Sequence, residues 1–258
     1  MTEIWNTVVF RPMLNGLLFL YSLLWRNFGL SIIVFTVLVR LLTLPMTMKQ
    51  LRSARKSQEM QPKLQELQKK YKDNKEKLAE EQMKLYKEAG INPIGCLGPM
   101  VIQMPIWIGL YQSISNALPY NPLQLLNLAR HIYTQVPTLS TLVPLNAKFL
   151  WLNLGRPDPY YIVPIVVVVT MWLQQKMMTT PSTGSEQEAM SQSMQITMPL
   201  MFGMITFQAA SGLGLYFVVT NVVQLIQNYF VSGWGALGTL FGKGGGAQKP
   251  VRTKDKGK

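Results

Sequence analysis

One arginine inside a long apolar stretch is the residue of this sequence with the clearest capacity for chemistry. Arg40 lies within residues 28–48, where no aspartate or glutamate occurs. Placing an arginine at the centre of a membrane-spanning helix costs about 2.5–3.5 kcal/mol on insertion scales. A carboxylate on a neighbouring helix usually offsets this cost, yet none of the five long apolar stretches carries one. Three solutions stay open: the side chain snorkels to the cytoplasmic surface, binds backbone carbonyls, or is hydrated from the inner side.

Neutral polar side chains in the same apolar stretches favour hydration. Thr36 lies one helical turn before Arg40, on the same face. The other stretches contribute amides and hydroxyls at Gln103, Gln112, Gln174, Gln175, Thr220, Asn221, Gln224, Gln227 and Asn228. Such groups around one guanidinium, without acids, predict a hydrated and positively charged cavity, which would attract acidic and polar groups of a polypeptide from the cytoplasm. The alternative is that these amides form hydrogen bonds between helices, which is common in membranes.

Other kinds of chemistry find little support in the sequence. An intramembrane enzyme needs a nucleophile and a base, and the apolar stretches contain no His, Asp or Glu. The single cysteine, Cys96, excludes an intrachain disulfide, and the single histidine, His131, cannot form a metal site alone. A small-anion transporter using Arg40 should show inverted repeats or broken helices, and we find no convincing internal repeat. We therefore expect neither an enzyme nor a bound cofactor.

Apolar and charged residues are separated along the chain. Hydrophobic residues make up 48% of it, yet the formal net charge is +13, which indicates long apolar runs with basic residues between them. Five runs approach the roughly 20 residues that a spanning helix needs. They cover residues 28–48, 97–117, 161–178, 194–209 and 213–231. The predicted fold is an all-α integral membrane protein with five transmembrane helices, the last three within 161–232, and an extracytoplasmic loop at 118–160.

An earlier apolar stretch, residues 13–25, is too short to span a bilayer. On a helix, Arg11, Asn15, Ser22 and Arg26 would share one narrow face around this stretch. That pattern is typical of a helix lying in the membrane interface, so residues 1–27 are predicted to form an N-terminal interfacial helix region. A signal anchor or a sixth span is the alternative.

Residues 49–96 contain the strongly charged part of the chain, with 12 basic and seven acidic residues between positions 49 and 92. A narrow apolar stripe, formed by Met60, Leu64, Leu67 and Tyr71, runs through its first half. A second stripe follows a break at residues 73–74. Two helices with thin apolar seams and a break between them predict an antiparallel cytoplasmic helical hairpin.

The distribution of basic residues predicts the orientation. With five spans, 19 of the 25 Lys and Arg residues share one side: 12 between residues 48 and 97, Lys176, and six after Gly242. Five basic residues fall on the other side. The positive-inside bias therefore predicts that the N-terminus lies outside. It also predicts that the tail, residues 233–258, is cytoplasmic, and its Gly- and Lys-rich composition predicts disorder.

Several motifs, taken in order, resemble the YidC-type membrane protein insertases. Residues 29–45 (GLSIIVFTVLVRLLTLP) are similar to the arginine-bearing span of that family. The family's later motifs are matched by residues 61–62 (QP), 86–87 (YK), 92–93 (NP), 102–107 (IQMPIW), 151–155 (WLNLG), 158–162 (DPYYI), 174–177 (QQKM) and 212–221 (GLGLYFVVTN). The similarity covers nearly the whole chain, and the ordered series is far more specific than any single motif.

The resemblance implies an insertase with a five-helix core, a cytoplasm-facing groove that holds Arg40, and a hairpin important for function. The predicted groove residues are Arg40, Thr36, Gln174, Gln175, Met104, Trp107, Phe217, Asn221 and Gln224. Of these, Thr36, Met104, Trp107 and Phe217 match positions on the family's substrate-facing side, and Gln174 or Gln175 matches a polar groove position. Phe217 stands where the family often carries Tyr or Trp.

The resemblance also implies partners and a location. The expected partners are nascent membrane proteins, the ribosome, the Sec translocon and membrane lipids, and the charge of the basic tail suits contact with rRNA. We recognise no transit peptide, so we expect the plasma membrane of a bacterium. No cofactor is expected.

Overall fold

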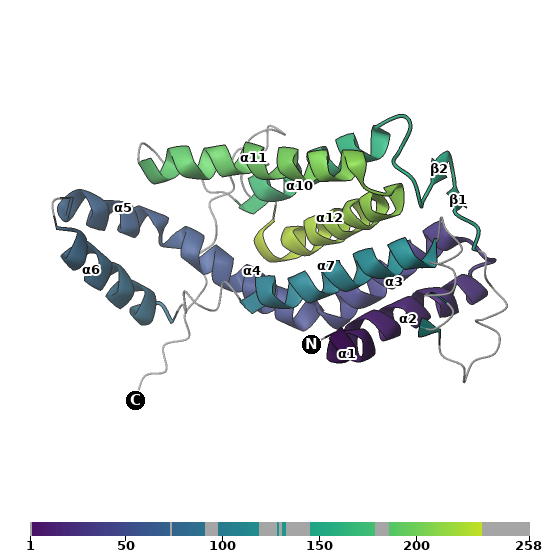
Figure 1. Cartoon of the computed structure of the whole chain (residues 1–258). Helices are drawn as coiled ribbons and strands as arrows, with labels where there is room; N and C mark the ends of the chain where they lie inside the picture. Colours follow the sequence, from purple (N-terminus) through teal and green to yellow (C-terminus); the bar gives the residue numbers. More distant parts are fainter. Residues whose placement is uncertain are drawn as a thin grey trace.

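A computed structural model gives the arrangement of the chain in space. It describes residues 2–72, 74–90, 98–118, 128, 131–132, 145–178 and 186–233. In this part of the chain the structure is almost entirely helical, and five long helices lie alongside one another with a helical arm at one end (Figure 1). The predicted tail lies outside the described residues, apart from Gly233, as does most of the predicted outer loop.

The chain begins with a helical hairpin. Helix α1 (Thr2–Trp5), the π-turn η1 (Asn6–Phe10) and α2 (Arg11–Leu23) run continuously, and α3 (Phe28–Leu42) follows after a short turn. Helix α2 packs against α3 and α7 (Gly98–Ala117), with Leu14, Leu17 and Leu18 buried in the core. Asn15 does not lie on an outer polar face. It is buried, and its amide is satisfied there because it donates hydrogen bonds to the backbone carbonyls of Arg11 and His131.

The predicted first span, residues 28–48, is not one straight helix. Helix α3 ends at Leu42, and α4 (Leu44–Glu59) begins after Thr43 at an angle of 65° to it. Pro45 explains the break, because proline cannot donate a backbone hydrogen bond and its ring collides with the preceding turn of a helix. Arg40 consequently lies in the last turn of α3, where a cation is favoured by the helix dipole.

Helix α12 (Ser211–Ser232) lies at the centre of the bundle and packs against α3, α4, α7, α10 (Ile162–Met178) and α11 (Glu186–Gln208). Two glycines allow α10 to approach its neighbours closely. A Cβ at Gly214 of α12 would collide with Val163, and a Cβ at Gly203 of α11 would collide with Val168. Small residues at such crossings are the usual way for helices to pack tightly in membranes.

A two-stranded hairpin lies against α3 and α12 at one end of the bundle. Strands β1 (Lys148–Phe149) and β2 (Leu152–Asn153) pair antiparallel, and Ser211 at the start of α12 donates through its hydroxyl to the carbonyl of Asn153. Asp158 is buried before α10, where its carboxylate accepts hydrogen bonds from the backbone N–H groups of Tyr160 and Val163. The hairpin and this cap fix the positions of the first turns of α10 and α12 relative to each other along the bundle axis.

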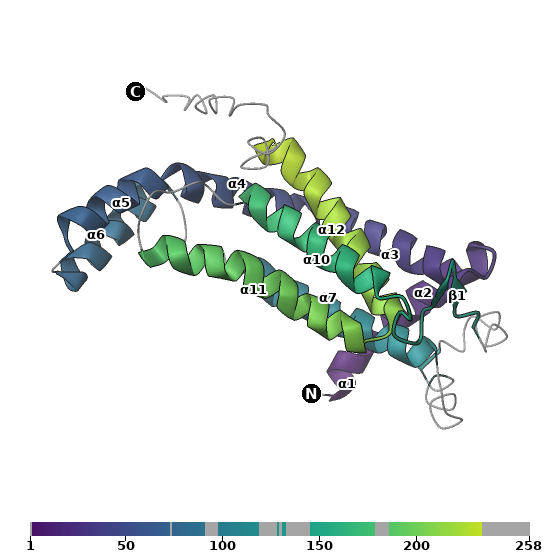
Figure 2. The same cartoon turned by 90° about the horizontal axis from the view of Figure 1, so that it is seen from above.

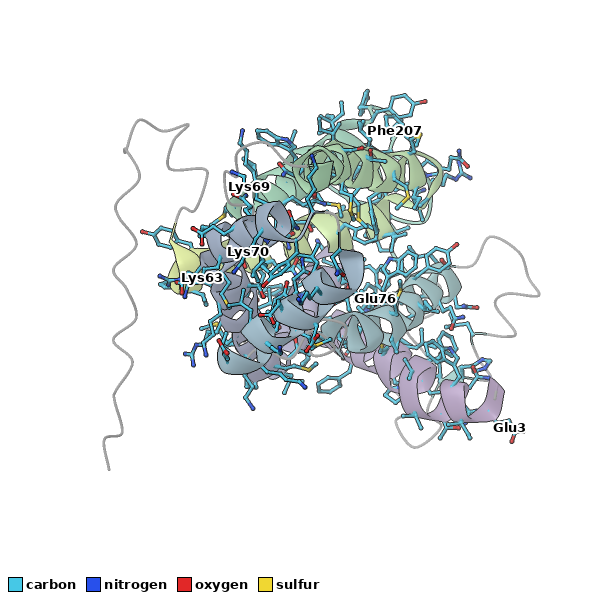
Figure 3. All side chains as sticks on the ribbon, turned by 90° about the vertical axis from the view of Figure 1, so that its left-hand side faces the viewer. Glu3, Lys63, Lys69, Lys70, Glu76 and Phe207 are labelled. Atoms are coloured by element: carbon cyan, nitrogen blue, oxygen red, sulfur yellow. The ribbon has the colours of Figure 1, made fainter. Side chains whose placement is uncertain are left out.

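The charged segment forms an arm that leaves the bundle. Helix α4 continues into α5 (Gln61–Lys70), and α6 (Lys75–Glu88) folds back against α5 (Figure 1 and Figure 2). Asn74 caps α6 by accepting a hydrogen bond from the N–H of Lys77. Figure 3, which looks at this end, shows Lys63, Lys69 and Lys70 on α5 and Glu76 on α6. On α6, hydrogen bonds to Glu81 and Glu80 raise the pKa of Lys84 above its ordinary value.

Hydropathy and length single out one part of the described chain. No single described helix is both long and apolar enough to cross a membrane by itself, whereas α3 together with residues Leu44–Ser57 of α4 meets that criterion across the bend. The apolar α10 falls short on length.

Candidate functional site

The predicted site centres on Arg40, and the face of α3 that carries this residue is buried. Ile32, Thr36 and Arg40 follow one another at intervals of four residues and face the interior of the bundle. Only 5% of Arg40 is exposed. Thr36 is deeper still at 1% exposure, and its hydroxyl donates to the carbonyl of Ile32 at 2.6 Å. Thr36 therefore satisfies its hydroxyl within its own helix and does not line the cavity described next.

An open groove of about 380 Å³ lies beside Arg40. Five helical segments form its walls: the α3–α4 corner, α7, α10, α11 and α12. Its lining residues are Arg40, Thr43, Met46, Thr47, Gln50, Gln103, Met104, Ile106, Trp107, Met171, Met198, Phe202, Tyr216, Phe217, Thr220 and Gln224. Arg40 thus borders an open space although little of its surface is exposed.

The groove contains a positive charge without a negative one. None of the residues that line it is an aspartate or glutamate. In the described part of the chain the ion pairs lie on α4 and α6, and none involves Arg40. The lining residues that follow it along the chain carry no charge: Thr43 at the corner, and Met46, Thr47 and Gln50 on α4. A buried cation among hydroxyls and amides, next to an open cavity, is the arrangement expected where water reaches the charge.

Aromatic and methionine side chains make up much of the remaining lining of the groove. Phe217 of α12 lies between Trp107 of α7 and Phe202 of α11, with ring centroids 6.2 Å and 5.5 Å away. Met104 and Met198 extend this surface. The side-chain amide of Gln103 donates to the hydroxyl of Tyr216 at 3.2 Å and links α7 to α12. The groove therefore presents cationic and polar groups together with a soft, apolar surface to the same space.

A second set of polar residues, which we call the polar seam, joins α10 to α12. Gln174 donates to Gln224 at 2.6 Å, and Asn221 donates to the hydroxyl of Thr170 at 3.1 Å. The hydroxyl of Thr170 also donates to the carbonyl of Val166, within its own helix. The polar seam thus consists of side chains that satisfy one another between two helices, as hydrogen-bonded amides commonly do in membranes.

The predicted residues therefore fall into two groups. Those that line the groove are Arg40, Met104, Trp107, Phe217 and Gln224. Those that do not are Thr36, Gln174, Gln175 and Asn221. Gln224 belongs to both places, because it lines the groove and also accepts the hydrogen bond from Gln174. Contact of any of these residues with a substrate stays a prediction.

Sequence reasoning missed part of the lining. Tyr216 and Phe202 were passed over, although both are large aromatic residues in predicted spans. The polar stripe Thr43, Thr47 and Gln50 could have been found, because it continues from Arg40 at intervals of three and four residues. The predicted groove residues do not include it.

Comparisons with known proteins agree with this architecture. A profile of the 60Kd inner membrane protein family matches residues 19–235. The chain is 31% identical over 210 residues to the membrane protein insertase YidC of Fusobacterium nucleatum, a match that covers 81% of this chain and 88% of that protein. It is 36% identical over 234 residues to the membrane protein insertase MisCA of Bacillus subtilis, covering 89% of this chain and 79% of that protein.

A solved structure of an active YidC insertase, with its first transmembrane domain resolved, matches with a TM-score of 0.56 and 23% identity. The match covers 86% of this chain and 46% of that one, and it shows a shared fold. The resemblance drawn from the motifs is confirmed, and since its relatives are insertases the expectation of a non-enzymatic protein agrees with its family. The chain is thus a membrane protein that belongs to the 60Kd inner membrane protein family, to which the YidC and MisCA insertases are related.

Proposed function

We propose that this protein is a membrane protein insertase that moves nascent membrane proteins from the cytoplasm into the bilayer along the groove beside Arg40. The observation that carries the proposal is the setting of Arg40, a buried cation at the edge of an open groove whose lining contains no carboxylate. Burying such a cation in a membrane protein costs free energy unless water and a ligand interact with it.

The polar part of the lining lowers the barrier for the hydrophilic part of a client. A polar or acidic segment that enters the groove stays hydrated there and is attracted by the positive charge of Arg40. It thereby avoids contact with hydrocarbon. The neutral side chains of Thr43, Thr47 and Gln50 offer hydrogen bonds along the way without binding a charge tightly. The segment can therefore both enter and leave, and the chain needs no bound nucleotide for this step.

The apolar part of the lining receives the hydrophobic part of the same client. Met104, Met198 and the cluster of Trp107, Phe202 and Phe217 form a surface that adapts to side chains of different shape, because methionine is flexible and polarisable. With both parts of the lining facing one cavity, a polar tail and the apolar helix attached to it can move together. The helix then passes to lipid as the tail crosses.

The proposal includes a topology. Helices α3, α7, α10, α11 and α12 are the five spans, residues 1–27 lie at the outer interface, and α4, α5 and α6 lie in the cytoplasm with the basic tail. The N-terminus is then outside, as the distribution of Lys and Arg predicts. Contacts with the ribosome, its rRNA and the Sec translocon would form on the cytoplasmic side, where the charged arm leaves the bundle (Figure 1).

Site-specific photocrosslinking tests the proposal. A photoreactive residue at Met104, which is exposed on the groove, should crosslink to a ribosome-bound nascent membrane protein. Ile165 of α10 is a matched control, because it is also an exposed apolar residue but does not line the groove. Equal crosslinking from both positions would show that clients meet the protein through its general apolar surface, and would remove the groove from the proposal.

A further inference from the structure

The far end of α4 is attached to the end of α12 by one arginine. Nη1 of Arg55 donates to the backbone carbonyl of Val231 at 2.8 Å, and Nε of the same side chain donates to Glu59 at 3.2 Å. The two helices pack together along this region. The contact joins residues 176 positions apart in sequence and therefore ties the root of the charged arm to the last helix of the bundle.

The carbonyl of Val231 is a favourable acceptor for this arginine. Helix α12 ends at Ser232, so Val231 is among the last four residues, whose carbonyls have no partner within the helix. These carbonyls carry the negative end of the helix dipole, which attracts a cation. Glu59, one turn further along α4, holds the guanidinium in place through an ion pair. We call this set, Arg55 with Glu59 and the Val231 carbonyl, the Arg55 clasp.

The helices joined by the clasp are the same ones that line the inner part of the groove. Thr47 and Gln50 belong to α4, and Thr220 and Gln224 belong to α12. The stripe on α12 continues at helical spacing to Gln227, which lies one turn before Val231. Gln227 is only 7% exposed, and its buried side-chain oxygen has no hydrogen-bond partner among the described residues. A polar group is thus enclosed between the end of the groove and the clasp.

We propose that Arg55 is a positioning residue that holds α4 against α12 and keeps the inner mouth of the groove closed over Gln227. When the bond to Val231 breaks, the arm tilts away, water and polar groups reach Gln227, and the groove lengthens by about one helical turn toward the cytoplasm. The part of this inference in which a client enters through the opened mouth rests on the proposed function.

The accessibility of residue 227 tests the clasp without any client. The full chain carrying Cys96→Ser and Gln227→Cys, reconstituted in lipid nanodiscs, is treated with a membrane-impermeant maleimide. We expect slow labelling with Arg55 present and labelling about tenfold faster with Arg55→Gln, which corresponds to about 1.4 kcal/mol in the opening equilibrium. Arg55→Lys should keep most of the protection, because an ammonium keeps the charge at the helix end.

Arg52→Gln is the matched control. Arg52 is an exposed arginine one turn earlier on the same helix, so its replacement removes the same charge without touching the clasp. Labelling that stays slow with Arg55→Gln, or that rises equally with Arg52→Gln, would overturn the proposal.

A second measurement leaves Gln227 in place. Spin labels at Glu76, at the start of α6, and at Phe230, on the exposed side of α12, report the position of the arm. The distance distribution between them should be narrow in the protein that keeps Arg55 and in the Arg52→Gln variant. It should be broad in the Arg55→Gln variant. An unchanged distribution with Arg55→Gln would contradict the clasp. If Arg55→Gln gives both faster labelling and a broader distance distribution, but the protein inserts no client, the clasp is supported and the proposed function is wrong.

Discussion

The groove at Arg40 and the polar seam between α10 and α12 place polar groups in the same apolar bundle but use them in opposite ways. In the seam, Gln174 bonds to Gln224 and Asn221 bonds to Thr170, so side chains of one helix satisfy those of the next. In the groove, Arg40 borders open space, and no ion pair reaches it in the described part of the chain. The presence of polar residues in an apolar helix is therefore a poor guide to a site. The absence of a partner within the bundle is a better one.

This difference has an energetic basis. A hydrogen bond between side chains in a membrane protein contributes about 0.6 kcal/mol on average, so pairs like those in the seam add modestly to stability. A cation without an ion pair costs several kcal/mol in a membrane unless it is hydrated, and the helix dipole at the end of α3 offsets only part of that cost. Removing seam residues should therefore act mainly on folding, whereas removing the cation should act mainly on function.

The strongest test of the contrast is Arg40→Ala. We expect insertion of clients with charged outer tails to slow about tenfold or more, which is the effect of raising a barrier by about 1.4 kcal/mol. Thermal stability should hardly fall, because the guanidinium makes no ion pair that would be lost. Protease protection of the client in proteoliposomes measures the first quantity. Arg40→Lys, which keeps the charge, is the control, and full insertion of every client by Arg40→Ala would end the role assigned to this residue.

Gln224→Leu tests the residue that belongs to both regions. We expect about threefold slower insertion, a barrier change of under about 1 kcal/mol, together with a loss of about 1 kcal/mol in stability. Gln174→Leu removes the same hydrogen bond but leaves the groove lining intact, so it should reproduce the loss of stability alone. Equal insertion defects in the two variants would mean that Gln224 acts only through the seam.

The pair Asn221 and Thr170 isolates the seam. A double-mutant cycle with Asn221→Ala and Thr170→Val should give a coupling energy of about 0.6 kcal/mol in unfolding measurements. Insertion should change little, because neither residue lines the groove. A defect with Asn221→Ala as large as that of Arg40→Ala would erase the distinction between the two regions.

Tyr216→Phe should have the smallest effect. The variant removes the hydroxyl that accepts the hydrogen bond from Gln103 but keeps the ring packed against Phe217. A neutral hydrogen bond of 3.2 Å lies at the weak end of the usual range, so we expect a stability loss of about 0.5 kcal/mol. Thermal unfolding measures it. A loss comparable with a buried charge pair would mean that the Gln103–Tyr216 bond organises the groove more strongly than its geometry indicates.

The sequence was sufficient for the parts that depend on the type of residue. Arg40, with its polar neighbours in acid-free apolar stretches, predicted a cavity beside this residue, and Arg40 lines an open groove, whereas hydration of that groove stays a prediction. The charged stretch with a break at residues 73–74 indicated two helices, and α5 and α6 lie on either side of that break. In both cases the residue types along the chain were informative: a lone cation in an apolar stretch needs a polar or open environment, and two amphipathic segments with a break between them form two helices.

The sequence was insufficient where the outcome depends on the rotation of one helix against another. Gln174 and Asn221 look like groove residues until α10 and α12 are placed side by side. Helices that are apolar on nearly every side carry little amphipathic signal, so the pattern does not fix which face meets which neighbour. The bend after Leu42 is different. Pro45 indicates a break in the sequence, yet residues 28–48 were predicted as one span.

The 65° corner at Thr43 makes α4 a lever whose fulcrum is next to Arg40. Its 16 residues correspond to about 24 Å of helix, so a swing of about 10° moves the far end by about 4 Å. That displacement is enough to break the hydrogen bond at Val231, while Arg40, close to the pivot, hardly moves. In the proposed mechanism, a large particle docking on the arm would thus pull the mouth of the groove open without displacing Arg40.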